Sequence, residues 1–244
     1  MKVTRHLRNG LLAGLAGGIA LAIVLLTIGE GPIGQAVGLE KRTTSGQHEE
    51  MFSRGTQQIG GALGGLVYGL ALGAIFAVAY VALRRRLSTN QDWTASLQLA
   101  GIGFATVFLV PFLKYPPNPP AVGSPDSIGR RTALYLVMLG WSVVATWAAW
   151  LAARSLDKRG TAVHIQPVAV SATYVFLIAV GFALLPGTPD PVNAPATLVW
   201  NFRLSSLSGA AAYWGVTGAV FGWLSLSDAR RPAHNDPLAH LEVH

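Results

Sequence analysis

The hydrophobic positions of this chain fall into long uninterrupted blocks, not into short amphipathic periods. Six blocks contain no Asp, Glu, Lys, Arg or His: 11–28, 59–83, 94–113, 132–153, 165–185 and 204–227. A helix needs roughly 20 apolar residues to cross the hydrocarbon core of a bilayer, whereas a helix on the surface of a soluble protein carries charges along one face. The pattern therefore predicts an all-α, polytopic membrane helix bundle.

We expect about six transmembrane helices arranged in three hairpins within one bundle. The predicted spans are about 10–29, 58–83, 94–113, 132–153, 165–185 and 204–227, forming a single transmembrane bundle over residues 1–227. A short polar tail, 228–244, follows. The first block comes after a basic start, as in a secretory signal, but it has no A-x-A-like cleavage site and is long for a signal core. We therefore interpret it as the first membrane helix.

A proline-rich connection between the third and fourth blocks is the most distinctive stretch of the chain. It reads KYPPNPPAVGSPDSIGRR over 114–131 and cannot be helical throughout, because proline lacks an N–H and disfavours helix in the residue before it. A similar loop followed by an arginine occurs within 182–213, and a weaker one within 28–69, which suggests repeated hairpins. The loop and mouth residues singled out are Arg54, Lys114, Pro116, Pro117, Pro119, Pro120, Asp126, Arg130, Arg131 and Arg203.

Arg54, Arg131 and Arg203 each stand near the predicted start of an even-numbered helix. That is the electrostatically unfavourable end for a cation, because a helix N-terminus carries partial positive charge. One account is that these side chains extend to lipid headgroups and anchor the helices. The other is that they pair with acids of the same face (Glu30, Glu49, Glu50, Asp126 and Asp190). Under the second account, Arg131 and Asp126 would clamp the proline-rich loop.

Glycines recur at every fourth position in the first two predicted helices. They are Gly10, Gly14 and Gly18 in the first, and Gly61, Gly65, Gly69 and Gly73 in the second. Such spacing keeps the glycines on one face, where a neighbouring backbone can approach closely. We expect these two helices to pack tightly, with the second near the bundle centre. The alternative is that the groove lines a permeation path.

The positive charge of the chain indicates its orientation in the membrane. The formal net charge is +7, from 18 Lys and Arg against 11 Asp and Glu. The two termini and the two short connections together hold eleven of the cations, and the three longer loops hold seven. The positive-inside rule then predicts both termini in the cytoplasm and the longer loops outside. We expect the lipid bilayer as a partner and no nucleic acid, because no basic patch is interleaved with aromatic residues.

Candidate metal ligands gather in the first long loop. His48, Glu49 and Glu50 are consecutive, and Glu30 and Asp126 belong to the same predicted face. Imidazole and carboxylate together suit divalent cobalt, nickel or zinc. Three consecutive residues of a regular helix cannot all reach one ion, so at most two of the three would share a site. The alternative is a solvated polar loop that pairs with its own cations, Lys41, Arg42 and Arg54.

Enzymatic function is not indicated. The chain has no cysteine, no G-x-S-x-G, no H-E-x-x-H and no phosphate-binding G-x-x-x-x-G-K motif, so we predict neither an enzyme nor a permanently bound cofactor. Ionisable side chains inside membrane spans usually mark proton relays and ion sites, and the six blocks contain none. Any path must therefore be lined by hydroxyls, amides and backbone carbonyls, or be completed by another subunit.

The stretch FLKYPPNPPAVGSPDSIGRRTALYLVML, the glycine-rich first helix and the segment HEEMFSRGTQ resemble the CbtA family of predicted cobalt transporter subunits. The resemblance runs from the first helix to the last and is most specific over 114–134. It implies a bacterial or archaeal multi-pass subunit of the inner membrane that imports Co²⁺ for cobalamin synthesis. It also implies a small one-helix partner of the CbtB type with a His-rich metal-binding segment. Members of the family are described with five spans, so the first block or 165–185 is the candidate for a non-spanning one.

Two other functional classes remain open from the residues alone. One is a substrate-capture subunit of a vitamin importer, similar to the six-helix subunits that work with a separate ATPase module. The other is a structural membrane scaffold without a ligand. The sequence does not specify the transported ion, the energy coupling, the oligomeric state or the helices that line a path.

Overall fold

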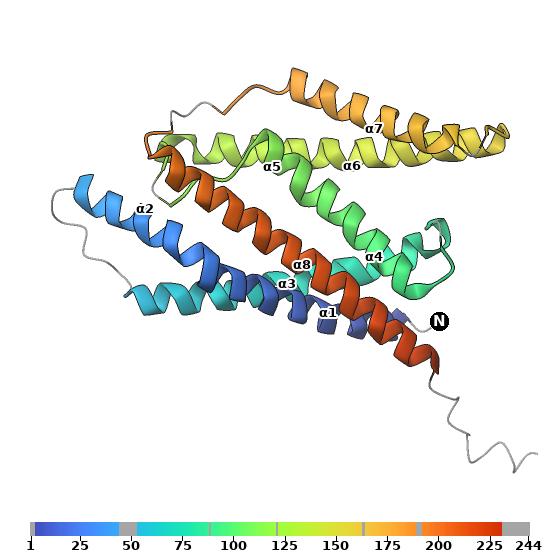
Figure 1. The fold of residues 1–244 in the computed structure, drawn as a ribbon, viewed down its shortest axis with the longest axis horizontal. Coiled ribbons are helices and arrows are strands. Elements are labelled where there is room, and N and C mark those ends of the chain that lie inside the picture. Colours follow the sequence, from blue (N-terminus) through green and yellow to red (C-terminus); the bar gives the residue numbers. More distant parts are fainter. Residues whose placement is uncertain are drawn as a thin grey trace, which may run out of the picture.

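The computed structural model describes residues 3–43, 53–87, 89–120, 122–162, 164–188 and 192–230, and every regular element in these ranges is a helix. The order is α1 (Val3–Val24), the π-helix η1 (Leu25–Gly29), α2 (Glu30–Thr43), α3 (Arg54–Leu83), the 3-10 turn η2 (Arg84–Arg86), α4 (Asp92–Gly103), the π-helix η3 (Phe104–Leu109), α5 (Val110–Lys114), the 3-10 turn η4 (Pro125–Ser127), α6 (Ile128–Lys158), α7 (Ile165–Leu184) and α8 (Ala196–Arg230). The predicted all-α membrane bundle is confirmed (Figure 1).

Each of the six apolar blocks is helical, and five helices of the described chain are long and apolar enough to cross a membrane. These five are Val3–Leu39, Arg54–Arg86, Asp92–Lys114, Ile128–Lys158 and Ile165–Leu184. The block that falls short in apolarity is therefore neither the first nor 165–185. It is α8, which is 35 residues long but carries glycines at its contacts with α1 and α4 (Gly209, Gly218 and Gly222). The tail predicted from 228 begins inside this helix, which continues to Arg230.

The loop predicted over residues 30–57 is wrong for its first half, because α1, η1 and α2 form one continuous helix as far as Thr43. Pro32 lies inside it. A proline within a helix lacks an N–H and crowds the carbonyl four residues earlier, here that of Ile28. The wider π-turn of η1 comes just before Pro32 and relieves this conflict, so the helix continues where a proline would otherwise break it.

A second π-segment precedes a second proline. In η3 the Val110 N–H bonds to the Ala105 carbonyl, five residues back, and Pro111 follows. Both π-segments are followed by polar residues at the same end of the bundle, which is visible in Figure 1 as the end where α2, α5 and the start of α8 meet. In both places the π-segment is followed by further helix, α2 after η1 and α5 after η3.

The first two glycine series pack against each other, as predicted. A methyl group built on Gly14 would collide with the Gly69 carbonyl, and one on Gly10 or Gly73 would likewise meet the backbone of the other helix. Gly61 is the exception, because nothing lies within 4 Å of its Cβ position. This close contact joins α1 and α3 along their length and makes van der Waals packing the main cohesive interaction between them.

The expectation that the second helix lies at the bundle centre is wrong, because α1 and α8 hold that place. α1 lies between α3 and α8, and α8 packs against α4 on its other side. Tyr213 of α8 is buried and donates a hydrogen bond from its hydroxyl to the Gly69 carbonyl of α3, at 3.2 Å. The hairpin of α6 and α7 lies on the side of α4 and α5, at the top of Figure 1.

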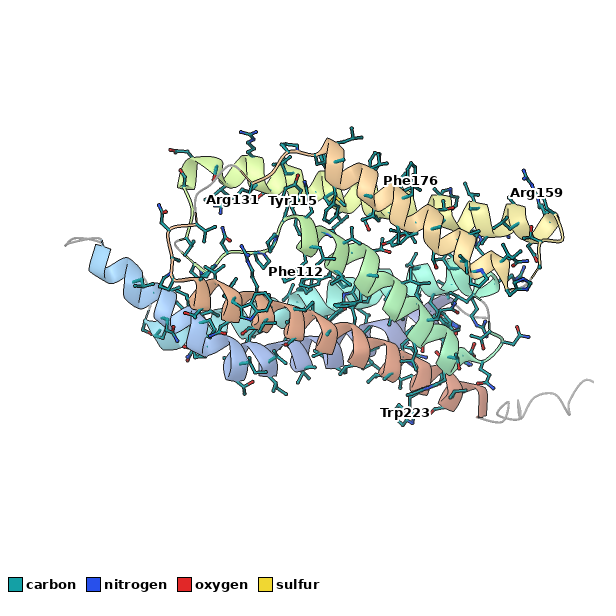
Figure 2. All side chains as sticks on the ribbon, turned by 45° about the horizontal axis from the view of Figure 1, so that its top comes forward. Phe112, Tyr115, Arg131, Arg159, Phe176 and Trp223 are labelled. Carbon is teal, nitrogen blue, oxygen red and sulfur yellow. The ribbon has the colours of Figure 1, made fainter. Side chains whose placement is uncertain are left out.

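The connections of the bundle divide between two ends. The end that holds the N-terminus, the 84–91 connection and the 159–164 connection is called here the terminus end, and the opposite one the loop end. At the terminus end Asp228 of α8 accepts hydrogen bonds from Asn9 (3.0 Å) and Arg8 (3.1 Å) of α1. Figure 2 shows Arg159 at this end, and Arg131 and Tyr115 at the loop end.

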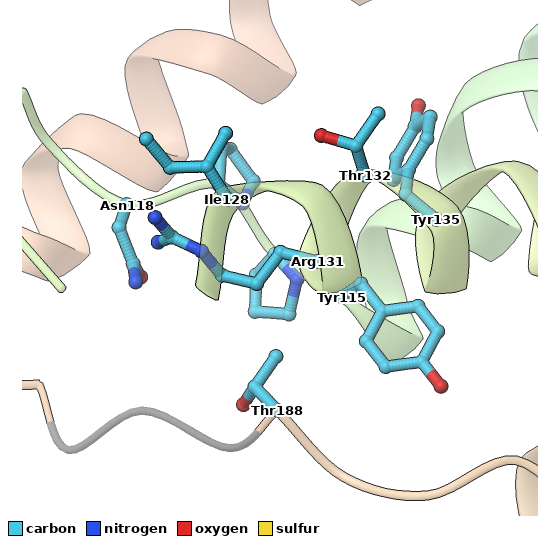
Figure 3. A pocket seen from close by; sticks show the side chains of 9 residues that line it. Tyr115, Asn118, Ile128, Arg131, Thr132, Tyr135 and Thr188 are labelled. Carbon is cyan, nitrogen blue, oxygen red and sulfur yellow. The ribbon is translucent and has the colours of Figure 1, made fainter. Parts of the chain in front are cut away.

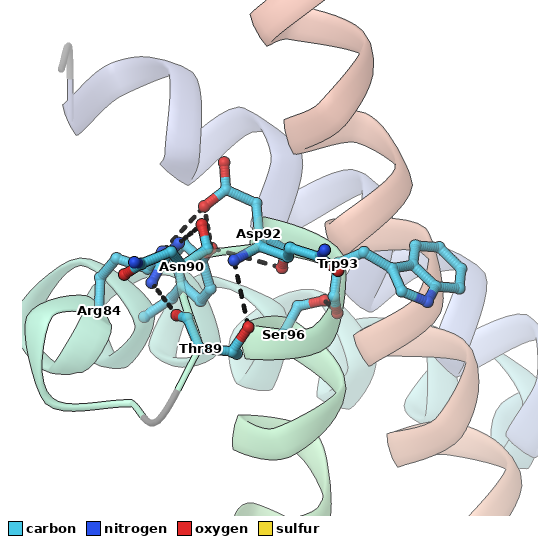
Figure 4. Close-up of polar contacts among 8 residues, drawn as sticks. Arg84, Thr89, Asn90, Asp92, Trp93 and Ser96 are labelled. Atoms are coloured by element: carbon cyan, nitrogen blue, oxygen red, sulfur yellow. Dashed lines mark hydrogen bonds and ion pairs between the residues drawn. The ribbon is translucent and has the colours of Figure 1, made fainter.

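The 84–91 connection is fixed by one arginine at the terminus end. Arg84 donates to the Asp92 carboxylate (2.8 Å) and to the carbonyls of Thr89 (2.7 Å) and Asn90 (2.6 Å), and the hydroxyl of buried Tyr80 donates to the same carboxylate (2.9 Å) (Figure 4). One guanidinium thus closes a short turn between two long helices. Arg84 belongs to the run of arginines that predicts a cytoplasmic face, and it also stabilises this connection.

Candidate functional site at the loop end

Glu30 and Arg54 form an ion pair at the seam between the first two long helices. Glu30 is the first residue of α2, directly after the π-segment, and Arg54 is the first residue of α3. The guanidinium donates twice to one carboxylate oxygen, at 2.8 and 3.1 Å, and once to Gln57 at 3.0 Å. Of the two sequence accounts of Arg54, pairing with an acid of the same end therefore describes its geometry.

A small cavity of about 120 Å³ opens beside this pair. Its polar lining comes from Glu30, Arg54, Gln57 and Gln58, and its apolar lining from η1 and the first turns of α3. Of the predicted metal ligands, Glu30 lines this cavity. Its carboxylate is paired with Arg54, so a metal ion would have to displace the guanidinium or bind the carboxylate together with it.

Of the other predicted ligands, only Asp126 lies within the described residues. Asp126 is exposed in η4, at the start of α6. His48, Glu49 and Glu50 lie outside the described residues, as does Asp190. Within the ranges that the structure describes, no three His, Asp or Glu side chains are grouped closely enough to hold a metal ion. The metal-ligand hypothesis for His48, Glu49, Glu50, Glu30 and Asp126 therefore stays a prediction.

The proline-rich loop is held by arginines from two helices. Arg203 of α8 donates to the Pro117 carbonyl at 3.3 Å and to the Asn118 side-chain oxygen at 3.1 Å. Arg131 of α6 donates to the Ser124 carbonyl at 3.5 Å. Both cations thus donate to main-chain oxygens of the loop, and the Ser124 carbonyl also accepts hydrogen bonds from Ser127. This use of Arg203 was not foreseen, because it depends on a contact between residues 86 positions apart.

Lys114 and Tyr115 connect the same loop to the end of α7. The Lys114 ammonium donates to the Phe182 carbonyl at 2.8 Å, and the Tyr115 hydroxyl donates to the Pro186 carbonyl at 2.7 Å. The carbonyls at a helix C-terminus have no partner within the helix and attract cations. Sequence reasoning marked Lys114 but missed Tyr115, for which no local signal exists.

Two larger cavities lie against these loop contacts. One, of about 300 Å³, is bounded by Tyr115–Asn118, the first turns of α6 and Thr188 (Figure 3). The other, of about 270 Å³, lies between residues 192–196 and Arg203. The loop end therefore combines long connections with cavities and charged side chains, which is the arrangement expected of a mouth.

Below the mouth, the described interior offers hydroxyl groups. Thr106 of η3 and Thr146 of α6 share a hydrogen bond of 2.9 Å between their hydroxyls, and Ser142, one turn from Thr146, is fully buried. The Ser142 hydroxyl oxygen has no hydrogen-bond partner. That a path is lined by such neutral oxygens stays a prediction.

These features define an all-helical integral membrane protein with a polar mouth at one end. The family model described as probable cobalt transporter subunit (CbtA) matches residues 3–225, and the chain belongs to this family. The CbtA resemblance drawn from the proline-rich stretch is thereby confirmed. No curated protein and no solved structure matches the chain.

Proposed function

We propose that this chain is the multi-pass subunit of a cobalt uptake system in the inner cell membrane, with both termini in the cytoplasm. The observation that carries the proposal is the family match over almost the whole chain, together with a helix bundle whose long connections and cavities share one end. In this orientation the loop end faces outward and meets the ion first. The surplus of Lys and Arg at the terminus end supports that orientation.

First contact with Co²⁺ is assigned to the segment between α2 and α3. His48, Glu49 and Glu50 supply imidazole and carboxylate ligands, and Asp126 lies exposed at the same end. Glu30 lines the 120 Å³ cavity beside Arg54 and directly follows the π-turn of η1. An ion released from the segment would meet this carboxylate next.

A partner subunit is part of the proposal. The membrane-spanning helices of this chain carry hydroxyls such as those of Thr106, Thr146 and Ser142, which are weak ligands for a dehydrated divalent ion. A small one-helix subunit of the CbtB type, with a His-rich segment, would supply the stronger ligands that the described interior lacks. The need for such a subunit explains how a chain with so few internal polar groups takes part in cation transport.

The proposal is tested by cobalt uptake in cells that express the chain with and without the small partner. Nickel and zinc are added in competition. The double substitution His48→Ala with Glu49→Ala is expected to lower uptake in the intact system. His164→Ala, an exposed histidine at the terminus end, is the matched control and should leave uptake unchanged.

Two results would contradict parts of this proposal. Unchanged uptake in the double variant would remove the ligand assignment while leaving the family function in place. Expression of both subunits without any gain of cobalt uptake over empty cells would remove the transport function itself.

A further inference from the structure

The 300 Å³ cavity beside the proline-rich loop is lined by hydrogen-bond donors and aromatic rings. Its walls are the rings of Tyr115 and Tyr135, and its polar groups belong to Asn118, Arg131, Thr132 and Thr188 (Figure 3). No Asp or Glu is among the described residues that line it. Its size is at the lower end of pockets that hold small organic molecules. With two tyrosine rings in its walls, a cavity of this size suits a ligand that has an apolar part beside its polar group.

Asn118 has amide donors to offer to this cavity. Its side-chain oxygen accepts the hydrogen bond from Arg203, and a guanidinium has donors but no acceptor. The oxygen, not the nitrogen, must therefore face Arg203, which fixes the orientation of the amide. The NH₂ group is the part of Asn118 that remains to serve a ligand.

Arg131 gives the cavity a permanent positive charge. A guanidinium stays protonated at every physiological pH and binds planar oxyanions through paired N–H donors. The side chain is half-buried, and Figure 3 shows it between Asn118 and Thr188. The nearest acid along the chain, Asp126, is exposed in η4 and does not line the cavity. A bare divalent cation would meet a like charge here and no carboxylate in the described lining.

We propose that this cavity binds an oxyanion, a carboxylate or a phosphate, carried by a small organic molecule or by a lipid headgroup. The oxyanion accepts hydrogen bonds from Arg131 and from the Asn118 amide, while the threonine hydroxyls serve its remaining oxygens. The tyrosine rings contact the apolar part of the ligand. Tyr115 is held in place for this role by its hydrogen bond to Pro186. This site lies beyond the proposed cobalt function and does not depend on it.

The test uses the purified full-length chain in a zwitterionic detergent and a buffer without phosphate. Its melting temperature is followed against citrate, inorganic phosphate and free Co²⁺, added separately. Two variants remove the proposed contacts, Arg131→Gln and Asn118→Asp. The second keeps an oxygen for Arg203, so it preserves the loop contact while it replaces the amide donor with a negative charge. Arg130→Gln, on the neighbouring exposed arginine, is the matched control.

We expect citrate or phosphate to raise the melting temperature of the wild type and of Arg130→Gln. In Arg131→Gln and Asn118→Asp, the concentration needed should rise about tenfold or more, because a charge-assisted hydrogen bond is lost. If only a lipid carries the group, the free anions have no effect. The chain in phosphatidylglycerol nanodiscs then melts higher than in phosphatidylcholine nanodiscs, and Arg131→Gln abolishes the difference.

Two outcomes would overturn the inference. One is that neither free anions nor the anionic lipid stabilises the chain in a manner that depends on Arg131. The other is that free Co²⁺ binds the wild type and this binding is lost in Arg131→Gln. The measurement involves no transport, so its failure would leave the uptake proposal standing, and a failed uptake experiment would leave this site standing.

Discussion

Arg54 and Glu30 begin two different helices and meet at 2.8 Å across the seam between them. Both side chains are about one-third exposed, at 34% and 32%, so solvent weakens the pair but does not abolish it. The same carboxylate is a predicted metal ligand and lines the cavity beside the pair. Whether it serves the helix contact, the ion, or both can be separated by substitution.

Glu30→Gln and Arg54→Gln should each lower the stability of the purified protein, and the double variant should lose less than the sum. The expected coupling is about 0.5–1 kcal/mol, because partly exposed ion pairs contribute little. A double-mutant cycle on thermal unfolding in detergent measures it. Gln57→Ala, which removes the neutral contact to Arg54 and keeps the ion pair, serves as the control. Additive losses would show that the two residues do not interact in solution.

Enlarging a glycine of the α1–α3 contact should separate the two helices. Gly69→Ala places a methyl group on the Gly14 backbone, and overpacking of this kind costs about 1–3 kcal/mol. Thermal unfolding in detergent should show a clear drop in melting temperature. Gly64→Ala on the same helix, where nothing lies within 4 Å, should leave it unchanged or raise it. Equal effects at the two sites would contradict the packing described.

The Ser205 hydroxyl lies 3.2 Å from the Ile28 carbonyl, the group that Pro32 leaves without its helical partner. It also lies 2.8 Å from the Asn201 carbonyl of its own helix. Ser205→Ala should cost about 1 kcal/mol of stability. Ser206→Ala should cost less, because the Ser206 hydroxyl donates to the Phe202 carbonyl of its own helix.

The same contact predicts a coupling with the proline. Pro32→Ala restores an N–H that can bond to the Ile28 carbonyl, so the cost of Ser205→Ala should shrink in that background. Unfolding of the four proteins of this cycle, under identical detergent conditions, gives the coupling. An unchanged cost of Ser205→Ala would show that the serine does not serve the carbonyl freed by Pro32.

Acid should weaken the tie between the N-terminus and the end of α8. The hydrogen bond from Asn9, together with the neighbouring Arg8 guanidinium, holds the pKa of Asp228 below its ordinary value despite partial burial. A carboxyl with a lowered folded pKa stabilises fully above its unfolded pKa of about 3.9 and loses that contribution as the pH falls through the folded value. Melting temperatures from pH 6 down to pH 3 should therefore fall more steeply for the wild type than for Asp228→Asn. Parallel curves would contradict this role.

The absence of cysteine allows a direct test of orientation. Pro120→Cys, at an exposed position of the proline-rich loop, should react with a membrane-impermeant thiol reagent in intact cells. Arg159→Cys, exposed at the terminus end, should react only after the cells are opened. The reverse pattern would invert the predicted topology and move the cavities to the cytoplasmic face.

The blocks of uncharged residues were sufficient to predict the helices, because the length of an apolar run directly reflects bilayer thickness. The glycine series also predicted the partner of α1, since every fourth residue shares a helix face. The error at residues 30–43 arose from treating Gly31-Pro32 as a break. A single π-turn and a hydroxyl from a distant helix reduce the cost of that proline, and neither has a signature in the local sequence.

The candidate site was predictable only in part. Positions of charge at one end of the bundle followed from the positive-inside rule and the loop lengths. The actual partners of Arg203, Lys114 and Tyr115 are main-chain or amide oxygens 68–86 residues away. A single sequence does not identify such pairs, because every residue, whatever its side chain, provides a main-chain carbonyl.

The continuous helix from Val3 to Thr43 has a consequence for where an ion first meets this protein. Its 41 residues extend roughly 60 Å at 1.5 Å per residue, against a hydrocarbon thickness of about 30 Å. A tilt of about 60° would be needed to conceal it, well outside the range of membrane helices. Part of it must therefore extend beyond the hydrocarbon core. With the predicted span at 10–29, the turns of α2 from Glu30 to Thr43 reach past the membrane surface at the loop end, and the chain continues from there into the segment that carries the proposed ligands.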